Sequence, residues 1–184
     1  MKIYLITGKA KSGKTTFGNH LREYLKEYDL NPCVMQITKP LYHYAEDYFE
    51  WDSRRDEKPR EFLQKFGIEI IRDKLNKKTF LLDRCYEDIE ILKEFFNVFI
   101  ITDLRFTEEV EYFKNKYDDV VLIKIDRFHY KSNLTNEQRK HITETEVDLI
   151  EDYDYLVENN TLADLKYNAK KIANEEEGEE AWIN

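Results

Sequence analysis

The sequence predicts an α/β fold in which five parallel strands form an open sheet with helices on both faces. Three observations lead to this prediction. Short apolar segments of strand length alternate with longer segments whose apolar residues recur at helical spacing. The strand segments are continuous apolar runs, as expected for strands buried on both faces. A glycine-containing loop joins the first strand to the first helix, at the sheet edge where such folds bind ligands.

The first half of the chain begins with a strand, a loop and a helix. Residues 2–7 are a short apolar run, and residues 14–28 carry apolar side chains at helical spacing. Residues 33–37 form a second strand, after which Pro40 lies in the first turn of a helix. A helical pattern then continues to the third strand, interrupted by a charged loop at residues 50–58.

The clearest strand is the third, at residues 97–103, which ends in an acid. A helix at residues 106–116 and a strand at residues 120–125 follow it. After a polar and basic stretch, the last strand covers residues 155–157, and Asn160 is expected to cap the final helix.

The chain is expected to form one domain over residues 1–184, because this length suits a single core and no linker divides it. The helical block at residues 40–96 is interpreted as an insertion, and residues 126–140 as a loop or flap. Residues 175–184 are rich in glutamate and are expected to form an acidic, frayed tail.

Composition excludes several functional classes. The formal charge is −9 and no basic field covers the chain, so a nucleic acid polymer is not an expected partner. No apolar run approaches the ~20 residues that span a membrane. Two cysteines without metal-binding spacing, and a start without a signal sequence, favour a cytoplasmic protein with free thiols.

A phosphate-binding motif lies between the first strand and the first helix. Residues 8–15 match G-x-x-x-x-G-K-[ST] at every fixed position. In this motif, backbone N–H groups and the positive end of the helix surround phosphate oxygens. Lys14 adds a cation for the β- and γ-phosphates, and the Thr15 hydroxyl is a ligand for Mg²⁺. The predicted ATP-binding residues of this loop are Gly8, Ala10, Lys11, Ser12, Gly13, Lys14, Thr15 and Thr16.

Two further residues are expected to face the same crevice. Asp103 ends the strand predicted to lie beside the first, where an acid can hold the metal directly or through water. A lone aspartate there can also be a helix cap or turn residue. Arg105 is interpreted either as a second crevice residue or as an ordinary surface charge. Residues 115–118 match the guanine motif N-K-x-D but precede a strand instead of following one, so a GTPase is not predicted.

Four blocks that together span nearly the whole chain resemble the motifs of one family. The first is the phosphate loop. The second contains residues 39–41 (KPL), Trp51-Asp52 and residues 59–72, similar to K-P-L, G-W-D and P-R-x-x-L-Q-x-x-G-T-E-x-x-R. The third, residues 102–109, is similar to D-V-R-F-x-N-E. The fourth contains Arg127 and residues 141–144, similar to H-x-S-E. In these blocks the chain resembles the bacteriophage-type deoxynucleoside monophosphate kinases, within the adenylate kinase-like P-loop kinases.

The resemblance implies a P-loop fold with strand order 2-3-1-4-5 and phosphoryl transfer from ATP, with Mg²⁺, to a nucleoside or deoxynucleoside 5′-monophosphate. It implies that the insertion binds the acceptor and that residues 126–140 form a lid. The implied acceptor-binding residues are Lys39, Arg60, Gln64, Arg72 and Arg105. The implied catalytic residues are Lys14, Asp103, Arg127 and Arg139, and Thr15 and Asp103 are the implied metal ligands. Asn160 is expected near the adenine because of its place after the last strand.

Several alternatives stay open at this stage. Glu50 and Ile68 replace a glycine and a threonine of the family motifs, which leaves the base and sugar preference undecided. A phosphomevalonate-like metabolite is an alternative acceptor, and a non-catalytic nucleotide-binding regulatory protein is an alternative function. His141 is interpreted as structural in preference to an acid or base, and a homodimer is compatible with the sequence. Candidate walls of a base-stacking site are Tyr42, Tyr44, Trp51 and Phe66.

Overall fold

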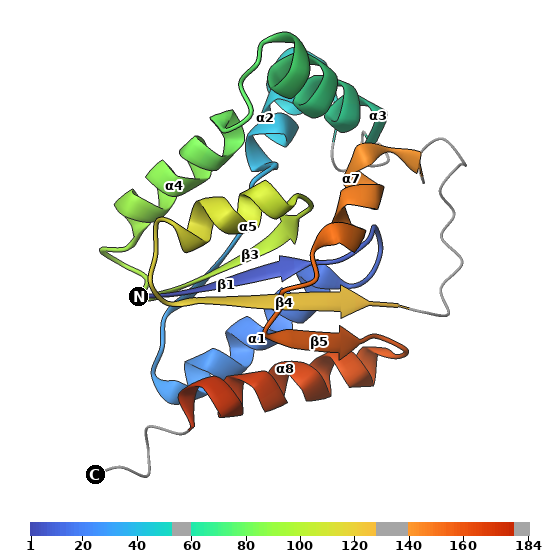
Figure 1. Ribbon diagram of the computed structural model, residues 1–184. Coiled ribbons are helices and arrows are strands. Elements are labelled where there is room, and N and C mark those ends of the chain that lie inside the picture. Colours follow the sequence, from blue (N-terminus) through green and yellow to red (C-terminus); the bar gives the residue numbers. More distant parts are fainter. Residues whose placement is uncertain (53–59, 128–139, 179–184) are drawn as a thin grey trace. The chain divides into compact units, whose positions relative to one another are not determined.

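The protein is described here by a computed structural model that covers residues 1–52, 60–127 and 140–178, and its central element is a five-stranded sheet (Figure 1). All four strand pairs are parallel. The order is β2-β3-β1-β4-β5, which confirms the predicted fold and strand order. The strands are β1 (Lys2–Thr7), β2 (Pro32–Met35), β3 (Val98–Leu104), β4 (Val120–Asp126) and β5 (Tyr155–Glu158).

The central position of β1 explains its continuous apolar sequence. It pairs with β3 on one side, in the register Lys2↔Val98, and with β4 on the other, in the register Ile3↔Val120. Residues 3–7 are all buried. Because both faces are covered, apolar side chains are favoured at successive positions instead of alternate ones.

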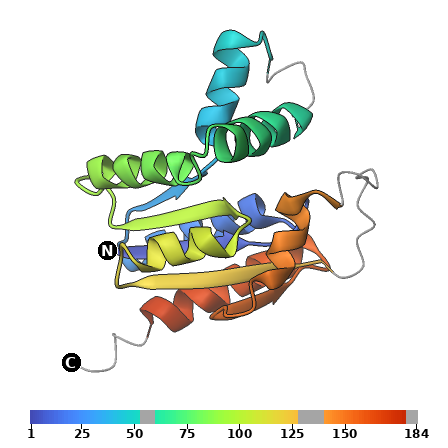
Figure 2. The same cartoon turned by 45° about the horizontal axis from the view of Figure 1, so that its top comes forward.

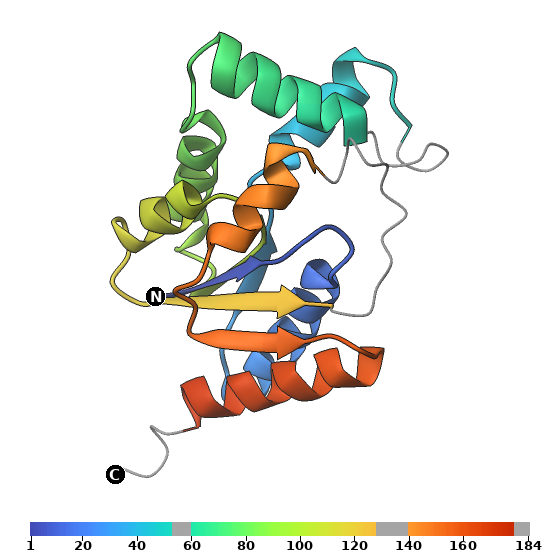
Figure 3. The same cartoon turned by 45° about the vertical axis from the view of Figure 1, so that its right-hand side comes forward.

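Helices cover both faces of the sheet, as predicted. On one face, α1 (Lys14–Leu25) and α8 (Leu162–Glu177) run side by side and share a core with β1 and β4 (Figure 3). On the opposite face lies α5 (Thr107–Lys114) (Figure 2). Shorter segments complete this part of the chain, namely η1 (Lys26–Tyr28), α7 (Ile142–Thr145) and η3 (Glu146–Leu149).

Residues 36–91 form a second compact unit, separate from the sheet-containing unit of residues 1–35 and 92–184. Its helices are α2 (Lys39–Tyr48), α3 (Arg60–Gln64), η2 (Lys65–Lys74) and α4 (Phe80–Leu92). The segment η2 is π-helical. This unit overlaps most of the predicted insertion at residues 40–96. The acceptor-binding role of that insertion stays a prediction.

The start of α8 differs from the sequence prediction. Its N-cap is Thr161 and not Asn160. The Thr161 hydroxyl accepts the backbone N–H of Asp164 at 3.2 Å, and the Asp164 carboxylate accepts the N–H of Thr161 at 2.8 Å. This reciprocal pair needs an acid three residues after the cap, and Asp164 supplies it only for Thr161.

The end of α8 also differs from the predicted tail at residues 175–184. The helix continues to Glu177, and residues 179–184 lie outside the described ranges. Lys2 at the start of β1 forms ion pairs with Glu176 and Glu177, each at 3.1 Å. Tyr155 donates a hydrogen bond to Glu176 at 2.6 Å. These contacts hold the first part of the acidic run against the sheet.

No helix within residues 1–52, 60–127 and 140–178 combines the length and apolar character that a membrane crossing requires.

Candidate functional site

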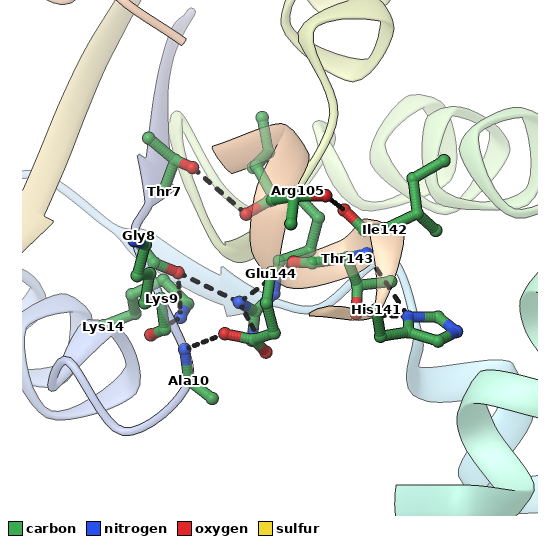
Figure 4. Close-up of polar contacts among 12 residues, drawn as sticks. Thr7, Gly8, Lys9, Ala10, Lys14, Arg105, His141, Ile142, Thr143 and Glu144 are labelled. Atoms are coloured by element: carbon green, nitrogen blue, oxygen red, sulfur yellow. Dashed lines mark hydrogen bonds and ion pairs between the residues drawn. The ribbon is translucent and has the colours of Figure 1, made fainter. Parts of the chain in front are cut away.

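The loop between β1 and α1 folds around the side chain of Lys14. Although it is charged, Lys14 is only 8% exposed. Its Nζ donates hydrogen bonds to the carbonyl oxygens of Gly8 at 2.6 Å and Lys9 at 2.8 Å (Figure 4). The ammonium group is therefore held inside the loop.

The second half of the loop leads directly into the N-terminus of α1. Gly13 has a φ of +100°, in the left-handed region that favours glycine. Thr15 and Thr16 are exposed in the first turn of α1, which carries no acidic residue. The Ser12 hydroxyl is buried and has no hydrogen-bond partner among the described residues. This end of the loop thus offers amide groups, hydroxyl groups and a helix N-terminus to an anion.

Two side chains beyond the sheet hold the carbonyl oxygens of this loop. The Asn159 amide donates to the carbonyl oxygen of Ser12 at 2.7 Å, and the Arg127 guanidinium donates to that of Lys11 at 3.4 Å. Asn159 follows β5 and Arg127 follows β4. The carboxyl ends of both strands therefore contact the loop, as expected at this edge of a parallel sheet.

A buried carboxylate holds the first half of the loop. One oxygen of Glu144, in α7, accepts the backbone N–H of Ala10 at 2.9 Å. Its other oxygen lies 3.3 Å from the Arg105 guanidinium. Arg105 also donates to the carbonyl oxygen of Gly8 at 3.2 Å (Figure 4). The loop, Arg105 and Glu144 are thus joined in one polar network.

Asp103 lies near the end of β3, in the strand beside β1. The register pairs Thr7 with Leu104, and the Thr7 hydroxyl donates to the Leu104 carbonyl oxygen at 3.2 Å. The end of β3 therefore lies next to the start of the phosphate loop. Asp103 itself is partly buried at this edge.

The turn after β3 is fixed by Glu109. Its carboxylate accepts the backbone N–H of Arg105 at 2.6 Å and that of Phe106 at 3.1 Å. Glu109 is partly buried. This burial raises the pKa of the Glu109 carboxyl to about 7, although the two backbone hydrogen bonds act to lower it.

Comparison with known proteins identifies the family. The family model for deoxynucleotide monophosphate kinase matches residues 51–169. The chain belongs to this family. The matched region begins after the phosphate loop, so the loop motif and its geometry are independent of the match. As a member of this family with a P-loop fold, the chain is a kinase that acts on a nucleotide or another small metabolite.

Several solved structures of other kinases are similar to this member of the deoxynucleotide monophosphate kinase family. The APS kinase of Mycobacterium tuberculosis, in complex with AMPPNP and APS, is 12% identical with a TM-score of 0.54, over 93% of this chain and 94% of that one. A gluconokinase from Sinorhizobium meliloti is 13% identical with a TM-score of 0.52, over 98% and 96%. The shikimate kinase of Aquifex aeolicus is 18% identical with a TM-score of 0.50, over 99% of each chain. At these identities the likeness concerns the fold. No curated protein sequence matches the chain.

The predicted acceptor-binding residues of this kinase fall partly in the unit of residues 36–91. Lys39 is the exposed first residue of α2, Gln64 ends α3, and Arg72 lies in η2. Because η2 is π-helical, the helical pattern predicted between the second and third strands is α-helical only as far as Gln64 in this stretch. The side chain of Arg60 lies outside the described part of the structure, as does Arg139.

The candidate base-stacking residues contact one another within this second unit. The rings of Tyr44 and Phe66 have centroids 5.7 Å apart, and those of Tyr42 and Trp51 are 5.8 Å apart. Phe62, which sequence reasoning did not single out, stacks on Phe66 at 5.2 Å. The aromatic side chains thus form a cluster whose binding role stays a prediction.

Asn160 lies at a polar hollow beyond β5. The hollow has a volume of about 360 Å³ and is lined by Leu156, Glu158, Asn160, Asp164 and Asn168. This volume is in the range of small-molecule sites.

In α7, His141 is the N-cap, and its Nδ1 accepts the backbone N–H of Thr143 at 3.3 Å. The structural interpretation of His141 stays a prediction.

Three polar residues of the site were missed by sequence reasoning, namely Asn159, Glu144 and Glu109. Glu144 and Glu109 belong to motif blocks that carry the family resemblance, so the blocks were a signal although no role was assigned. Asn159 had no such signal, because a polar residue beside Asn160 after a short strand is ordinary loop composition.

Proposed function

We propose that the protein transfers the γ-phosphoryl group of ATP to the 5′-phosphate of a deoxynucleoside monophosphate, which yields ADP and the diphosphate. The match to the deoxynucleotide monophosphate kinase family over residues 51–169 carries this proposal. The phosphate loop at residues 8–15 supports a nucleoside triphosphate as donor. The complex of the similar APS kinase with AMPPNP supports ATP in particular.

The donor phosphates are proposed to bind in the loop around Lys14. The loop fits them, because the buried Ser12 hydroxyl has no partner among the described residues and is available to a phosphate oxygen. Lys14 Nζ, now donating to the carbonyl oxygens of Gly8 and Lys9, can donate to the β- and γ-phosphates instead. The hollow lined by Asn160 is the proposed adenine site.

Thr15 and Asp103 are the residues proposed to hold Mg²⁺. Hydroxyl and carboxylate oxygens are ligands that this ion prefers, and the remaining ligands in such sites are water and substrate phosphates. The described residues contain no group of three or more potential metal-binding His, Cys, Asp or Glu side chains. When bound, Mg²⁺ supplies positive charge to the phosphate oxygens.

Cationic side chains are proposed to align the acceptor with the donor. Arginine suits this task because its planar N–H groups bind phosphate oxygens in pairs. Arg127, which already contacts the loop, and Arg139 are proposed to stabilise the transferred group. Residues 126–140, of which 128–139 lie outside the described ranges, are proposed to form the lid. The proposed acceptor-binding residues are Lys39, Arg60, Gln64, Arg72 and Arg105.

The rate then comes from alignment and charge neutralisation. Phosphoryl transfer through a loose transition state requires little proton transfer, so no general base is assigned. Lys14 neutralises the donor end, while the arginine side chains hold the acceptor oxygen in line with the γ-phosphorus.

A coupled assay of ADP release tests the proposal. ATP is supplied with each of the four deoxynucleoside monophosphates, with ribonucleoside monophosphates, and with phosphomevalonate. We expect turnover that requires a deoxynucleoside monophosphate. Lys14→Ala should lower kcat by at least about a hundredfold. Arg60→Ala should raise the KM for the acceptor by about tenfold or more.

Matched controls separate these losses from general charge effects. Lys171→Ala and Arg22→Ala remove a lysine and an arginine whose ion pairs with Glu175 and Glu23 are exposed. Both variants should retain the activity of the wild type. If no monophosphate raises ADP release above the rate with ATP alone, the proposed function is wrong. Turnover with phosphomevalonate but with no nucleoside monophosphate would mean that the acceptor is a phosphorylated metabolite of another class, and the proposed acceptor would be wrong.

A further inference from the structure

We propose that Glu144 is a positioning residue, which sets Arg105 and the phosphate loop in the arrangement needed for phosphoryl transfer. The inference rests on the proposed function, because it assigns Arg105 a phosphate to bind. Glu144 itself is proposed to contact neither nucleotide. It acts through the two groups that its carboxylate joins.

The contacts of Glu144 connect three segments that are distant in sequence. Glu144 is 5% exposed, and each carboxylate oxygen has its own partner. One oxygen accepts the Ala10 N–H at 2.9 Å, and the other faces the Arg105 guanidinium at 3.3 Å (Figure 4). A buried carboxylate with both oxygens engaged has one favoured orientation, so it constrains both of its partners.

Arg105 is the charged partner of the carboxylate. Its guanidinium also donates to the Gly8 carbonyl oxygen at 3.2 Å and the Thr143 carbonyl oxygen at 3.5 Å. Its backbone N–H is held by Glu109. Of the acceptors around the guanidinium, Glu144 supplies the negative charge, while Gly8 and Thr143 supply neutral carbonyl groups. The charge of the carboxylate therefore strengthens the hold on the guanidinium beside the loop.

The Ala10 contact has a different consequence. If the Ala10 N–H pointed into the anion site, the loop would offer the phosphate oxygens a different set of donors. By accepting this N–H, Glu144 fixes the orientation of the peptide between Lys9 and Ala10. The same carboxylate thus fixes both the conformation of the loop and the position of the Arg105 guanidinium. A single substitution can separate these two effects.

Glu144→Gln and Glu144→Ala make this separation. Glutamine retains an oxygen that can accept the Ala10 N–H, but its amide lacks the charge that pairs with Arg105. Alanine removes both contacts. We expect Glu144→Gln to lower kcat about tenfold or more, with less than about a threefold change in the KM for ATP. In Glu144→Ala, hydrogen exchange of the Ala10 amide should also accelerate.

The double variant decides whether Glu144 acts through Arg105. Adding Glu144→Gln to Arg105→Ala should cause no further loss of kcat, because the group that it positions is already absent. The control is Asp148→Asn, which removes an exposed ion pair with Lys9 of the same loop at 2.9 Å and should leave kcat unchanged. Thermal unfolding verifies that each variant is folded at the assay temperature.

Two results would overturn the inference. One is a kcat of Glu144→Gln equal to that of the wild type. The other is an equal loss of kcat from Glu144→Gln in the wild-type and Arg105→Ala backgrounds. A wild type that phosphorylates no monophosphate would instead contradict the proposed function. In that case the affinity for ATP and the hydrogen exchange of the Ala10 amide are compared between Glu144→Ala and the wild type. If both values are unchanged, the inference that Glu144 positions the loop is wrong.

Discussion

The side-chain amide of Asn159 donates a hydrogen bond to the carbonyl oxygen of Ser12 at 2.7 Å, so the residue that follows β5 holds the phosphate loop. Asn159 is 6% exposed, and water therefore cannot readily replace this bond. The Ser12 carbonyl oxygen would lose a buried partner without it. The bond links the conformation of the loop to the proposed adenine side of the site.

Asn159→Ala is expected to weaken ATP binding about tenfold. Loss of a buried hydrogen bond leaves the Ser12 carbonyl oxygen unsatisfied, at a cost of roughly 1–3 kcal/mol, and releases the loop. Calorimetric titration with ATP measures the change. Asn31→Ala is the control, because Asn31 also donates an amide hydrogen bond to a carbonyl oxygen, that of Phe95, but is exposed before β2. Equal affinities of Asn159→Ala and the wild type would contradict the prediction.

Gly18→Ala is expected to destabilise the protein although alanine favours helices over glycine by about 1 kcal/mol. A Cβ at Gly18 in α1 would lie 2.5 Å from Cγ2 of Thr102 in β3. Overpacking at such a contact costs roughly 1–3 kcal/mol. Chemical denaturation measures the free energy of unfolding, and an unchanged or increased value would show that the helix accommodates the methyl group.

Thr102→Ser provides the matched rescue of Gly18→Ala. Serine removes the Cγ2 methyl group but keeps a hydroxyl that can donate to the Met35 carbonyl oxygen, as Thr102 does at 3.4 Å. The double variant should be more stable than the sum of the single effects predicts, by about 1 kcal/mol. Strict additivity would mean that the two side chains do not collide.

The parts of the fold that sequence reasoning predicted are those that local sequence determines. The strand predicted at residues 2–7 is β1, and the one predicted at residues 97–103 is β3, shifted by one residue. Both are central strands, whose two covered faces require continuous apolar runs. The phosphate loop was predictable for a similar reason, since one short segment supplies its glycines, its lysine and its helix N-terminus.

The contacts that sequence reasoning missed join residues far apart in the chain. Asn159 and Ser12 are separated by 147 positions, and Glu144 and Ala10 by 134. No local pattern reports such a pair, because Asn159 and Glu144 are ordinary polar residues of a loop or helix start and their partners are backbone groups. The π-helical segment Lys65–Lys74 was missed for another reason, since its apolar residues were interpreted with an α-helical period.

Glu177→Gln is expected to lower the free energy of unfolding by about 1–2 kcal/mol. Glu177 accepts hydrogen bonds from Lys2 and from the buried Tyr4 hydroxyl, each at 3.1 Å. Burial alone would lower the pKa of Lys2, but the hydrogen bonds and charges of Glu177 and Glu176 outweigh it and raise that pKa above 10.5. The contribution of Lys2 is therefore fully present at neutral pH and is lost only as pH rises through its raised pKa.

Denaturant titration at about pH 7 measures the effect of Glu177→Gln. The control is Glu175→Gln, whose partner Lys171 lies on the same helix and whose ion pair is exposed. That change should stay within about 0.5 kcal/mol. A loss no larger for Glu177→Gln than for Glu175→Gln would mean that the contacts with Lys2 and Tyr4 add nothing to stability.

Glu109→Gln is expected to flatten the dependence of stability on pH between about pH 5 and 8. Burial raises the pKa of Glu109 from 4.5 to about 7, so the folded state retains a proton that the unfolded state releases. The retained proton contributes about 3 kcal/mol at most to the free energy of unfolding. This contribution is complete below pH 4.5 and is lost as pH rises through 7. Glutamine imitates the protonated acid and can still accept the N–H groups of Arg105 and Phe106. Calorimetric Tm values across this range should therefore fall more steeply with rising pH in the wild type than in the variant, and parallel curves would contradict the assignment.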